Sequence, residues 1–317
     1  MTNKEKYRIL CEKELSIPIY SRDWWLDCAC GDKWEVLLYM NEEQIEASMP
    51  VYLPNKETIT MPVYTQTMGI WFNPMFDNNS YSKNLHRKQV ICEYFISCLP
   101  SHNHFLQNFH HSFTDWLPFY WKGYNQTTRY TYILPSISNL EEIESNLNTN
   151  LKRNLKKAKE KYHLEVKKDI PTDMFLEINS LTYERQGKKA YHPEVLRKLI
   201  DTSRKRNQGD IWGAYDEQGK LHAAVFLVWQ ENCAYYIAGG ANPELRKSGA
   251  HALVMWKAIC ELAEISSSFD FEGSMIQGVE RFFREFGATQ MPYFTLSKGT
   301  QKVTGRIKSF LKKKITS

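Results

Sequence analysis

Residues 270 to 287 read DFEGSMIQGVERFFREFG, and this stretch decides the fold. Its first residues belong to the segment Phe269–Glu272, in which apolar and acidic residues alternate and a strand is expected. Glycines then interrupt the chain, and a helix is expected from Gly278 to Phe286. A second strand-like segment, Met291–Leu296, follows. The stretch therefore predicts a strand, a helix and a second strand.

The segment before this stretch predicts three strands joined by short polar turns: Asp210–Tyr215, Leu221–Trp229 and Cys233–Ala238. Gly239 and Gly240 are expected to end the third strand, and a helix is expected over Pro243–Ala263. A meander, a helix and a strand–helix–strand unit form an α+β layout in which helices cross between strands.

The N-terminal third reads as strands followed by a helix over Leu85–Cys98. A long helix is expected over Ser138–Tyr162, because Ser138 and Glu141 have capping-box spacing. With 317 residues and 42% hydrophobic content, two domains are favoured over one.

Several motifs resemble those of a known family. Asp270–Ser274, followed by Gly278-Val279 and by Phe282–Gly287, resembles the D-x-G-S…G-I-x-x-F-K-x-x-F-G signature of Fem-like proteins, a GNAT-superfamily group related to FemAB- and FemX-type peptidoglycan aminoacyltransferases. Leu151–Ala158 is similar to the basic helix that precedes the second acyltransferase half of that family.

The resemblance implies a tandem GNAT fold, an α+β structure of two mixed sheets with flanking helices. Residues 1–133 are expected to form a degenerate N-terminal GNAT-like domain, and residues 134–317 the C-terminal one. An N-terminal half without a mixed sheet would contradict this prediction. The resemblance also implies transfer of an acyl group to an amine. The donor is aminoacyl-tRNA in the Fem branch and acyl-CoA in ordinary GNAT proteins, and both remain open.

Ala241–Ala250 resembles the GNAT Q/R-x-x-G-x-G/A loop, with Arg246 and Gly249 in place and His251 where the second small residue belongs. The resemblance implies that the phosphates of the donor bind along this loop, and the candidate residues are Arg246, Lys247, Ser248 and Gly249.

Acyl transfer needs hydrogen-bond donors for the developing oxyanion, a base for the amine and an acid for the leaving group. Gly239 and Gly240 are candidates for the first task, and a tight bulge without a catalytic role is the alternative. Asp270 and Glu272 are expected to share one face of a strand, and Glu272 is the candidate base. The alternative is that one carboxylate caps the next helix or pairs with an arginine on it.

Position 283 departs from the family pattern. Fem-like proteins have lysine there, and the ordinary GNAT helix has a tyrosine acid, whereas this chain has Phe283. Neither of those polar atoms is available. Tyr293 or Lys298 is a candidate replacement, solvent is a second alternative, and binding without turnover is a third.

Two stretches carry excess positive charge. Asn150–Lys168 contains eight Lys or Arg residues, and the chain from Lys298 to its end contains seven and no acidic residue. Lys152, Arg153 and Lys156 are candidate contacts for the phosphates of a donor, and a solvated helix face is the alternative. A phosphate-rich ligand is then expected to bind with a steep dependence on salt, reduced when Lys152 and Arg153 are both replaced by alanine.

Composition narrows the remaining choices. The longest strictly apolar run has seven residues, Ala223–Trp229, so no membrane span or signal peptide is expected. Seven scattered cysteines fit a reducing cytoplasm. Four histidines between positions 102 and 111 lack the spacing of a zinc site, so no metal is expected.

Three functions remain open from the sequence. The first is N-acyl or aminoacyl transfer to an amine on a cell-envelope or polysaccharide precursor. The second is CoA-dependent N-acetylation of a small amine. The third is a non-catalytic GNAT-fold protein that binds RNA or a nucleotide-linked ligand through its basic helices. The partners expected are thus a phosphate-bearing small molecule or tRNA as donor and an amine acceptor; the sequence does not reveal the oligomeric state.

Overall fold

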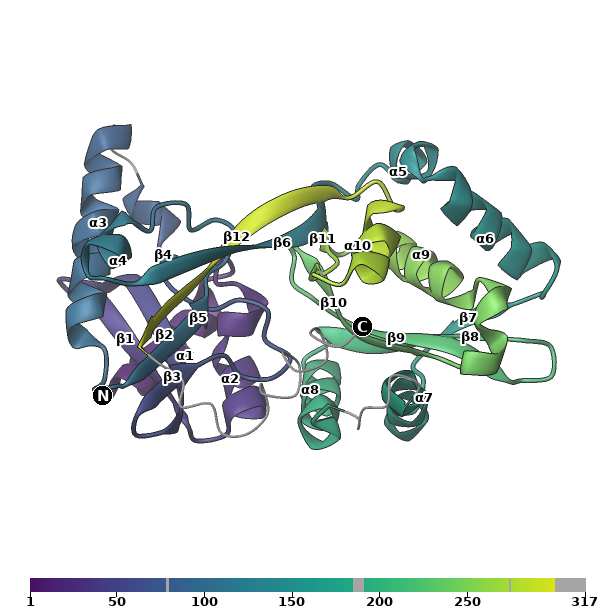
Figure 1. Ribbon diagram of the computed structural model, residues 1–317, viewed down its shortest axis with the longest axis horizontal. Helices are drawn as coiled ribbons and strands as arrows, with labels where there is room; N and C mark the ends of the chain where they lie inside the picture. Colours follow the sequence, from purple (N-terminus) through teal and green to yellow (C-terminus); the bar gives the residue numbers. More distant parts are fainter. Residues whose placement is uncertain (78–79, 185–190, 274, 300–317) are drawn as a thin grey trace, which may run out of the picture.

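The computed structural model describes residues 1–77, 80–184, 191–273 and 275–299. Two halves lie side by side and are joined by a pair of long strands (Figure 1). The C-terminal basic stretch beyond Gly299 lies outside the described residues.

The first half contains the elements α1 (Asn3–Lys13), η1 (Ile19–Ser21), α2 (Asp23–Cys30), β1 (Trp34–Asn41), β2 (Gln44–Asn55), β3 (Thr58–Thr60), β4 (Trp71–Phe72), η2 (Pro74–Phe76), α3 (Tyr81–Cys98), β5 (His104–Asn108), α4 (Leu117–Trp121) and β6 (Asn125–Leu134). The second contains α5 (Leu140–Asn146), α6 (Thr149–Glu160), β7 (Glu165–Lys168), α7 (Thr172–Glu184), α8 (Pro193–Lys205), β8 (Gly209–Tyr215), β9 (Leu221–Trp229), β10 (Ala234–Ala241), η3 (Pro243–Ser248), α9 (Ala250–Leu262), β11 (Phe269–Asp270), α10 (Gln277–Arg284) and β12 (Thr289–Gly299).

The expected α+β fold class is confirmed, with one refinement. The two expected sheets are continuous, because the strands of the described residues follow a single path, β1-β2-β3-β5-β12-β6-β11-β10-β9-β8-β7, with β4 paired to β2. The sheet is mixed: β3–β5 and β10–β11 are parallel pairs, whereas the other pairs along the path are antiparallel.

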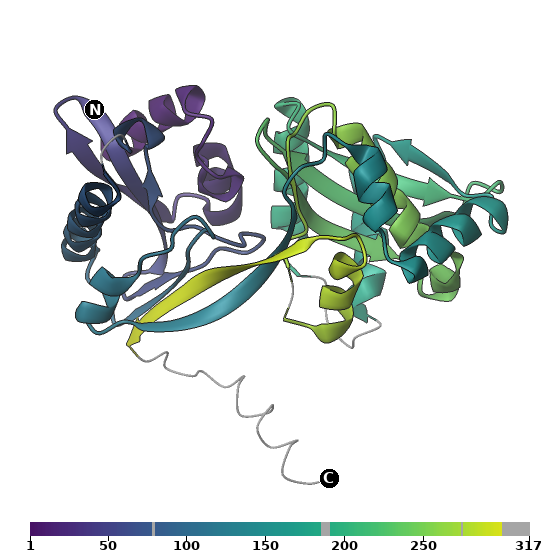
Figure 2. The ribbon, with the colours of Figure 1, turned by 90° about the horizontal axis from the view of Figure 1, so that it is seen from above.

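Continuity comes from β6 and β12, which run together from one half to the other (Figure 2). Their antiparallel pairing extends from Thr289 opposite Ile133 to Ser297 opposite Asn125. The far end of β12 pairs with β5 in the first half, so the last described strand of the chain completes the N-terminal sheet. The boundary at residues 133 and 134 stays a prediction.

The hydrophobic cores also connect the halves. One cluster lies around α9 and α10, and another lies between α3 and the strands β2, β3 and β5. A third contains buried side chains from both halves, including Trp25 and Leu26 from α2 with Phe175, Leu199 and Phe226 from the second half. Burial of large apolar side chains is the main favourable term in folding, so this shared cluster stabilises the contact between the halves.

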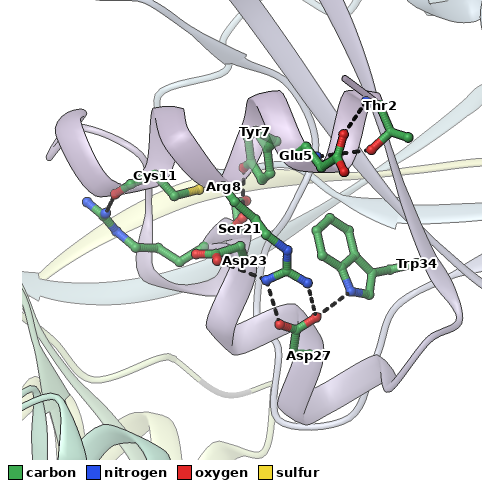
Figure 3. A network of polar contacts seen from close by, with 10 residues as sticks. Thr2, Glu5, Tyr7, Arg8, Cys11, Ser21, Asp23, Asp27 and Trp34 are labelled. Atoms are coloured by element: carbon green, nitrogen blue, oxygen red, sulfur yellow. Dashed lines mark hydrogen bonds and ion pairs between the residues drawn. The ribbon is translucent and has the colours of Figure 1, made fainter.

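Helices α1 and α2 form a polar network that holds the short η1 segment between them (Figure 3). Arg8 donates to Asp23 at 3.1 Å and to Asp27 at 2.7 Å, and the Trp34 indole N–H donates to Asp27 at 3.0 Å. The Tyr7 hydroxyl donates to the Ser21 carbonyl at 2.7 Å. These contacts fix α1, η1 and α2 relative to one another, and they thereby position Tyr20, which lies in η1.

Three local predictions were wrong. The expected helix over Ser138–Tyr162 is two helices, α5 and α6, because Asn139 and Asn148, rather than Ser138, cap two separate N-termini. The expected helix over Pro243–Ala263 is interrupted at Gly249, which has φ +81°. Gly239 and Gly240 lie inside β10 instead of ending it.

No helix within the described ranges has both the length and the apolar character needed to cross a bilayer.

Candidate active site

The site is built where two parallel strands separate. β10 and β11 pair only at Ala234–Phe269 and Tyr235–Asp270, and beyond that point β10 continues alone on this side. A bulge between Tyr236 and Ala238 shifts its register against β9. A pocket of about 460 Å³ opens beside the second half of β10, with walls from α6, α7, α9 and α10. The separation of the strands thus creates room for a ligand in the middle of a sheet.

The two glycines of β10 have different roles. A Cβ on Gly240 would lie 2.6 Å from the backbone nitrogen of Asn179, so α7 packs directly on that residue. Asn179 donates to the Gly239 carbonyl at 2.9 Å, and Thr182 accepts from the Ala241 N–H at 3.4 Å. Because polar backbone groups alternate along an antiparallel strand, the N–H of Gly239 faces the side away from β9 and that of Gly240 faces β9. Of the two, Gly239 is the better oxyanion donor.

The predicted phosphate-binding loop forms one wall of the pocket. Arg246, Ser248 and Gly249 line it together with the first residues of α9, and the N-terminus of a helix attracts anions. A Cβ on Gly249 would lie 2.5 Å from the Asn154 carbonyl oxygen of α6. A glycine is therefore required both by φ +81° and by the close approach of α6. Lys247 is exposed and does not line the pocket.

The basic residues of α6 are divided between two faces. Asn154 is the α6 residue that lines the pocket. At about 100° per residue, Lys152 and Lys156 point roughly 160° away from Asn154, on the opposite face of the helix. Lys152 donates to the Ser145 carbonyl at 2.8 Å, and Lys156 pairs with Glu160 at 3.8 Å. Lys156 therefore has an acidic partner on its own helix, and neither lysine faces the pocket.

Arg153 and Lys157 lie closer to the pocket side of α6, roughly 100° and 60° from Asn154. The Lys157 ammonium lies 5.8 Å from the centre of the Tyr162 ring. Lys157 was not among the sequence candidates, although its position on the helix makes it a better one than Lys152 or Lys156.

Glu272 is not on the face of a strand as expected. β11 ends at Asp270, and Glu272 has φ +61°, a conformation that non-glycine residues rarely adopt. Its N–H donates to the Asp270 carboxylate at 2.7 Å. Burial raises the pKa of Glu272 well above its usual range, and the Asp270 charge adds to this, whereas a hydrogen bond from Tyr20 opposes it. Glu272 is not among the residues that line the pocket, but a strained, desolvated carboxyl group is typical of a functional site.

The first half of the chain contacts Glu272 at two atoms. The Tyr20 hydroxyl donates to the Glu272 carboxylate, and the Gln66 amide donates to its carbonyl oxygen. Tyr20 is buried and packs edge-on against Tyr235 of β10, with ring centroids 5.3 Å apart. The conformation of Glu272 therefore depends on both halves. Neither Gln66 nor Tyr20 was among the sequence candidates, because no local pattern distinguished them.

Asp270 lies beneath Glu272 and is 4% exposed. It accepts from the Thr131 hydroxyl and from the Glu272 N–H. Burial raises the pKa of Asp270 to about 6, because those two hydrogen bonds only partly offset the loss of solvent.

We expect Asp270→Asn to be more stable than the unmodified protein at pH 8 and similar to it near pH 4. The folded-state pKa of Asp270 is about 6 and lies above the unfolded value, so its contribution to stability is complete at low pH and is lost as pH rises through about 6. Asparagine cannot ionise, yet its oxygen can accept the same two hydrogen bonds. Thermal melts from pH 4 to 8 measure the difference, expected to be about 2–4 °C at the upper end. A difference independent of pH would contradict the burial argument.

Tyr293 and Lys298 were the two candidates for the acid that is missing at position 283, and they lie far apart. Tyr293 is buried in β12, and burial raises its pKa to about 12, with smaller influences from Arg129, Glu272 and Asp270. Lys298 is five residues further along the same strand, roughly 17 Å away at about 3.4 Å per residue. Its ammonium donates to the Lys122 carbonyl at 2.6 Å in the first half. The structure therefore does not bring Lys298 to the pocket.

Three pocket residues were not among the sequence candidates for catalysis. Tyr236 and His251 both pack against Gly239, because a Cβ there would collide with the Tyr236 hydroxyl and lie 2.8 Å from the His251 ring. Burial lowers the pKa of His251 to about 4, and the charge of Arg246 adds to this. His222 is 3% exposed, its Nε2 lies 3.1 Å from the Asp216 carboxylate, and its buried Nδ1 has no hydrogen-bond partner among the residues that the structure describes. Only the tertiary structure brings these residues together.

Within the part of the chain that the structure describes, no group of three or more His, Cys, Asp or Glu side chains is placed to hold a metal ion. His104 is buried near the start of β5, and His110 and His111 pack ring to ring 4.0 Å apart in the first half.

Comparison with known proteins supports a GNAT-like fold. Residues 145–284 match the sequence profile of the GNAT acetyltransferase domain. No curated protein matches the chain by sequence.

Several solved structures resemble most of the chain in fold. FemX has a TM-score of 0.67 at 10% identity, over 93% of this chain and 96% of that one. L-PGS from Bacillus licheniformis has a TM-score of 0.53 at 10% identity, over 95% and 92% of the two chains. A tandem GNAT protein from the clavulanic acid biosynthesis pathway has a TM-score of 0.50 at 8% identity, over 93% and 89%. At these identities the likeness concerns the fold, which is a tandem GNAT-like fold.

Proposed function

We propose that this chain is an N-acyltransferase that moves an acyl group from a phosphate-bearing donor to an amine. The observation that carries the proposal is a single pocket that joins the Arg246–Gly249 loop to Gly239, at the place where β10 leaves β11. A donor whose phosphates bind at the start of α9 would lie with its acyl group beside the N–H of Gly239.

Acyl-CoA is the donor we favour. Its diphosphate matches the anion-binding end of the pocket, where Arg246 and the start of α9 lie. Ordinary GNAT proteins use acyl-CoA, and residues 145–284 match the GNAT acetyltransferase profile. Aminoacyl-tRNA is the alternative, favoured by the basic residues of α6 and by the resemblance to Fem-type enzymes.

The acceptor amine is proposed to approach Glu272 from the side of the first half, where Tyr20 and Gln66 hold that residue. A carboxyl group with a raised pKa is well matched to accept a proton from an amine near neutral pH, since general bases work best when their pKa lies near the operating pH. A cell-envelope or polysaccharide precursor that carries an amine is the proposed acceptor class.

Two measurements test the proposal. Thermal melts with acetyl-CoA, with CoA and with aminoacylated tRNA identify the donor, because a ligand that binds only the folded protein raises the melting temperature. Thiol release from acetyl-CoA in the presence of amino acids, amino sugars and polyamines tests transfer. Stabilisation by tRNA with no transfer from either donor would favour the non-catalytic alternative instead.

We expect Arg153→Ala combined with Lys157→Ala to weaken donor binding and to reduce its log–log salt slope by about one to two, because each contact to a phosphate releases counterions. The measurement is binding of CoA, and separately of tRNA, from low to moderate salt.

The matched control is Lys152→Ala combined with Lys156→Ala, which removes the same charge from the face opposite Asn154. Equal effects of the two double variants would mean that the whole helix acts only through its net charge. If neither double variant changed donor binding, the basic residues of α6 would be a solvated helix face with no role in binding.

A further inference from the structure

We propose that the Tyr236 hydroxyl is the general acid that protonates the leaving group of the acyl donor, from a strand position that replaces the helix position 283. The inference rests on the proposed acyl transfer and names a residue for it. It follows from where Tyr236, Gly239 and Phe283 lie relative to one another.

Tyr236 precedes the bulge of β10 and lines the donor pocket. Its hydroxyl occupies the space where a side chain on Gly239 would begin, so only glycine at 239 allows this placement. The hydroxyl forms no hydrogen bond with any other residue that the structure describes, although it can both donate and accept. It is therefore available to a ligand beside the same glycine whose N–H faces away from β9.

The ring of Tyr236 packs against Phe283, which occupies the position of the usual acid. Its centroid lies 5.9 Å from that of Phe283, which is 3% exposed and carries no polar atom. The Tyr236 hydroxyl therefore enters the pocket from β10 beside position 283, the α10 position at which ordinary GNAT proteins have a tyrosine acid.

The other candidates in this region are less suitable acids. His251 also packs on Gly239, but with a pKa lowered to about 4 it is almost entirely unprotonated near neutral pH. Tyr293 lies on β12, outside the residues that line the pocket. Burial raises the pKa of Tyr236, with further contributions from the charges of Tyr183 and Glu272. The hydroxyl is therefore protonated near neutral pH and has a proton to donate.

The step balances as follows for a thioester donor. The lone pair of the amine forms a C–N bond to the carbonyl carbon, and the C–S bond breaks with its electron pair on sulfur. The Tyr236 hydroxyl gives its proton to that sulfur, which leaves as a thiol. The proton lost by the amine passes to Glu272, and Tyr236 is reprotonated from Glu272 through solvent. The products are an amide and a free thiol.

The test compares Tyr236→Phe, Phe283→Tyr and the double variant, with acetyl-CoA as donor and thiol release as readout. We expect Tyr236→Phe to lower turnover about 10- to 100-fold, at the low end for general acid catalysis because a thiolate with a pKa of about 8.5 is a fair leaving group. Binding of CoA and the melting temperature should change little, because only one oxygen is removed. Tyr215→Phe on β8 is the matched control and should retain full activity.

The double variant returns a hydroxyl to the same region from α10, so it should recover at least part of the lost turnover. Tyr236→Phe with unchanged turnover would overturn the inference while leaving the proposed function intact. A folded double variant, judged by its melt, with no recovery would also overturn it. Absence of transfer by the unmodified protein with every donor would overturn both.

Discussion

Glu272→Gln is expected to lower acyl-transfer turnover roughly 10- to 1000-fold with little change in stability, because it removes a base and preserves the shape around it. The glutamine oxygen can still accept from the Tyr20 hydroxyl, and the backbone bonds to Asp270 and Gln66 do not involve the side chain. What is lost is the ability to take a proton from the amine.

The pH dependence gives the sharper evidence. Because burial raises the pKa of Glu272, turnover of the unmodified protein should rise with pH above the ordinary carboxylic-acid range as this group ionises. Glu272→Gln should lose that rise. Tyr20→Phe should move it to higher pH, because the hydrogen bond from Tyr20 lowers the pKa of Glu272. These profiles are measured with acetyl-CoA and one amine held constant.

Glu280→Gln is the matched control. Glu280 lies on α10, pairs with Arg284 at 2.9 Å and does not line the donor pocket. Its replacement should leave turnover and the pH profile unchanged. If Glu272→Gln keeps full turnover but lowers the melting temperature, then Glu272 has a structural role only, and the base must be sought elsewhere.

Gly240→Ala is expected to destabilise the protein by about 1–3 kcal/mol and to reduce donor binding. The added Cβ would lie 2.5 Å from the Ile178 carbonyl carbon and 2.6 Å from the Asn179 nitrogen, so it meets backbone rather than a flexible side chain. Ile178 is buried in the core that both halves share, which prevents α7 from yielding locally. Movement of α7 would also disturb the Asn179 bond to Gly239 and with it the pocket.

Gly278→Ala provides the comparison. Gly278 lies in α10 and lines the same pocket, but a Cβ there has nothing within 4 Å. Alanine is favoured over glycine in helices by up to about 1 kcal/mol, so this variant should be at least as stable as the unmodified protein. Urea denaturation measures both. Equal stability of Gly240→Ala and the unmodified protein would mean that β10 and α7 are not held as closely as the structure indicates.

Local patterns in the sequence determined the elements around the site. The predicted strand Leu221–Trp229 has the bounds of β9, and Asp210–Tyr215 differs from β8 by one residue. The loop motif identified Arg246 and Gly249, which line the pocket. These predictions succeed because a continuous apolar run bounded by polar turns, and a glycine at a required left-handed turn, depend on neighbouring residues.

Tertiary structure alone decided which residues form the site. The bond between Tyr20 and Glu272 joins positions 252 residues apart, and Glu272 leaves the strand conformation that its local pattern predicts. Lys298 was a candidate by sequence proximity, yet β12 carries it into the other half. Periodicity records which face a residue occupies within its own element, whereas the position of that element depends on long-range pairing and shared burial, which no short stretch of sequence contains.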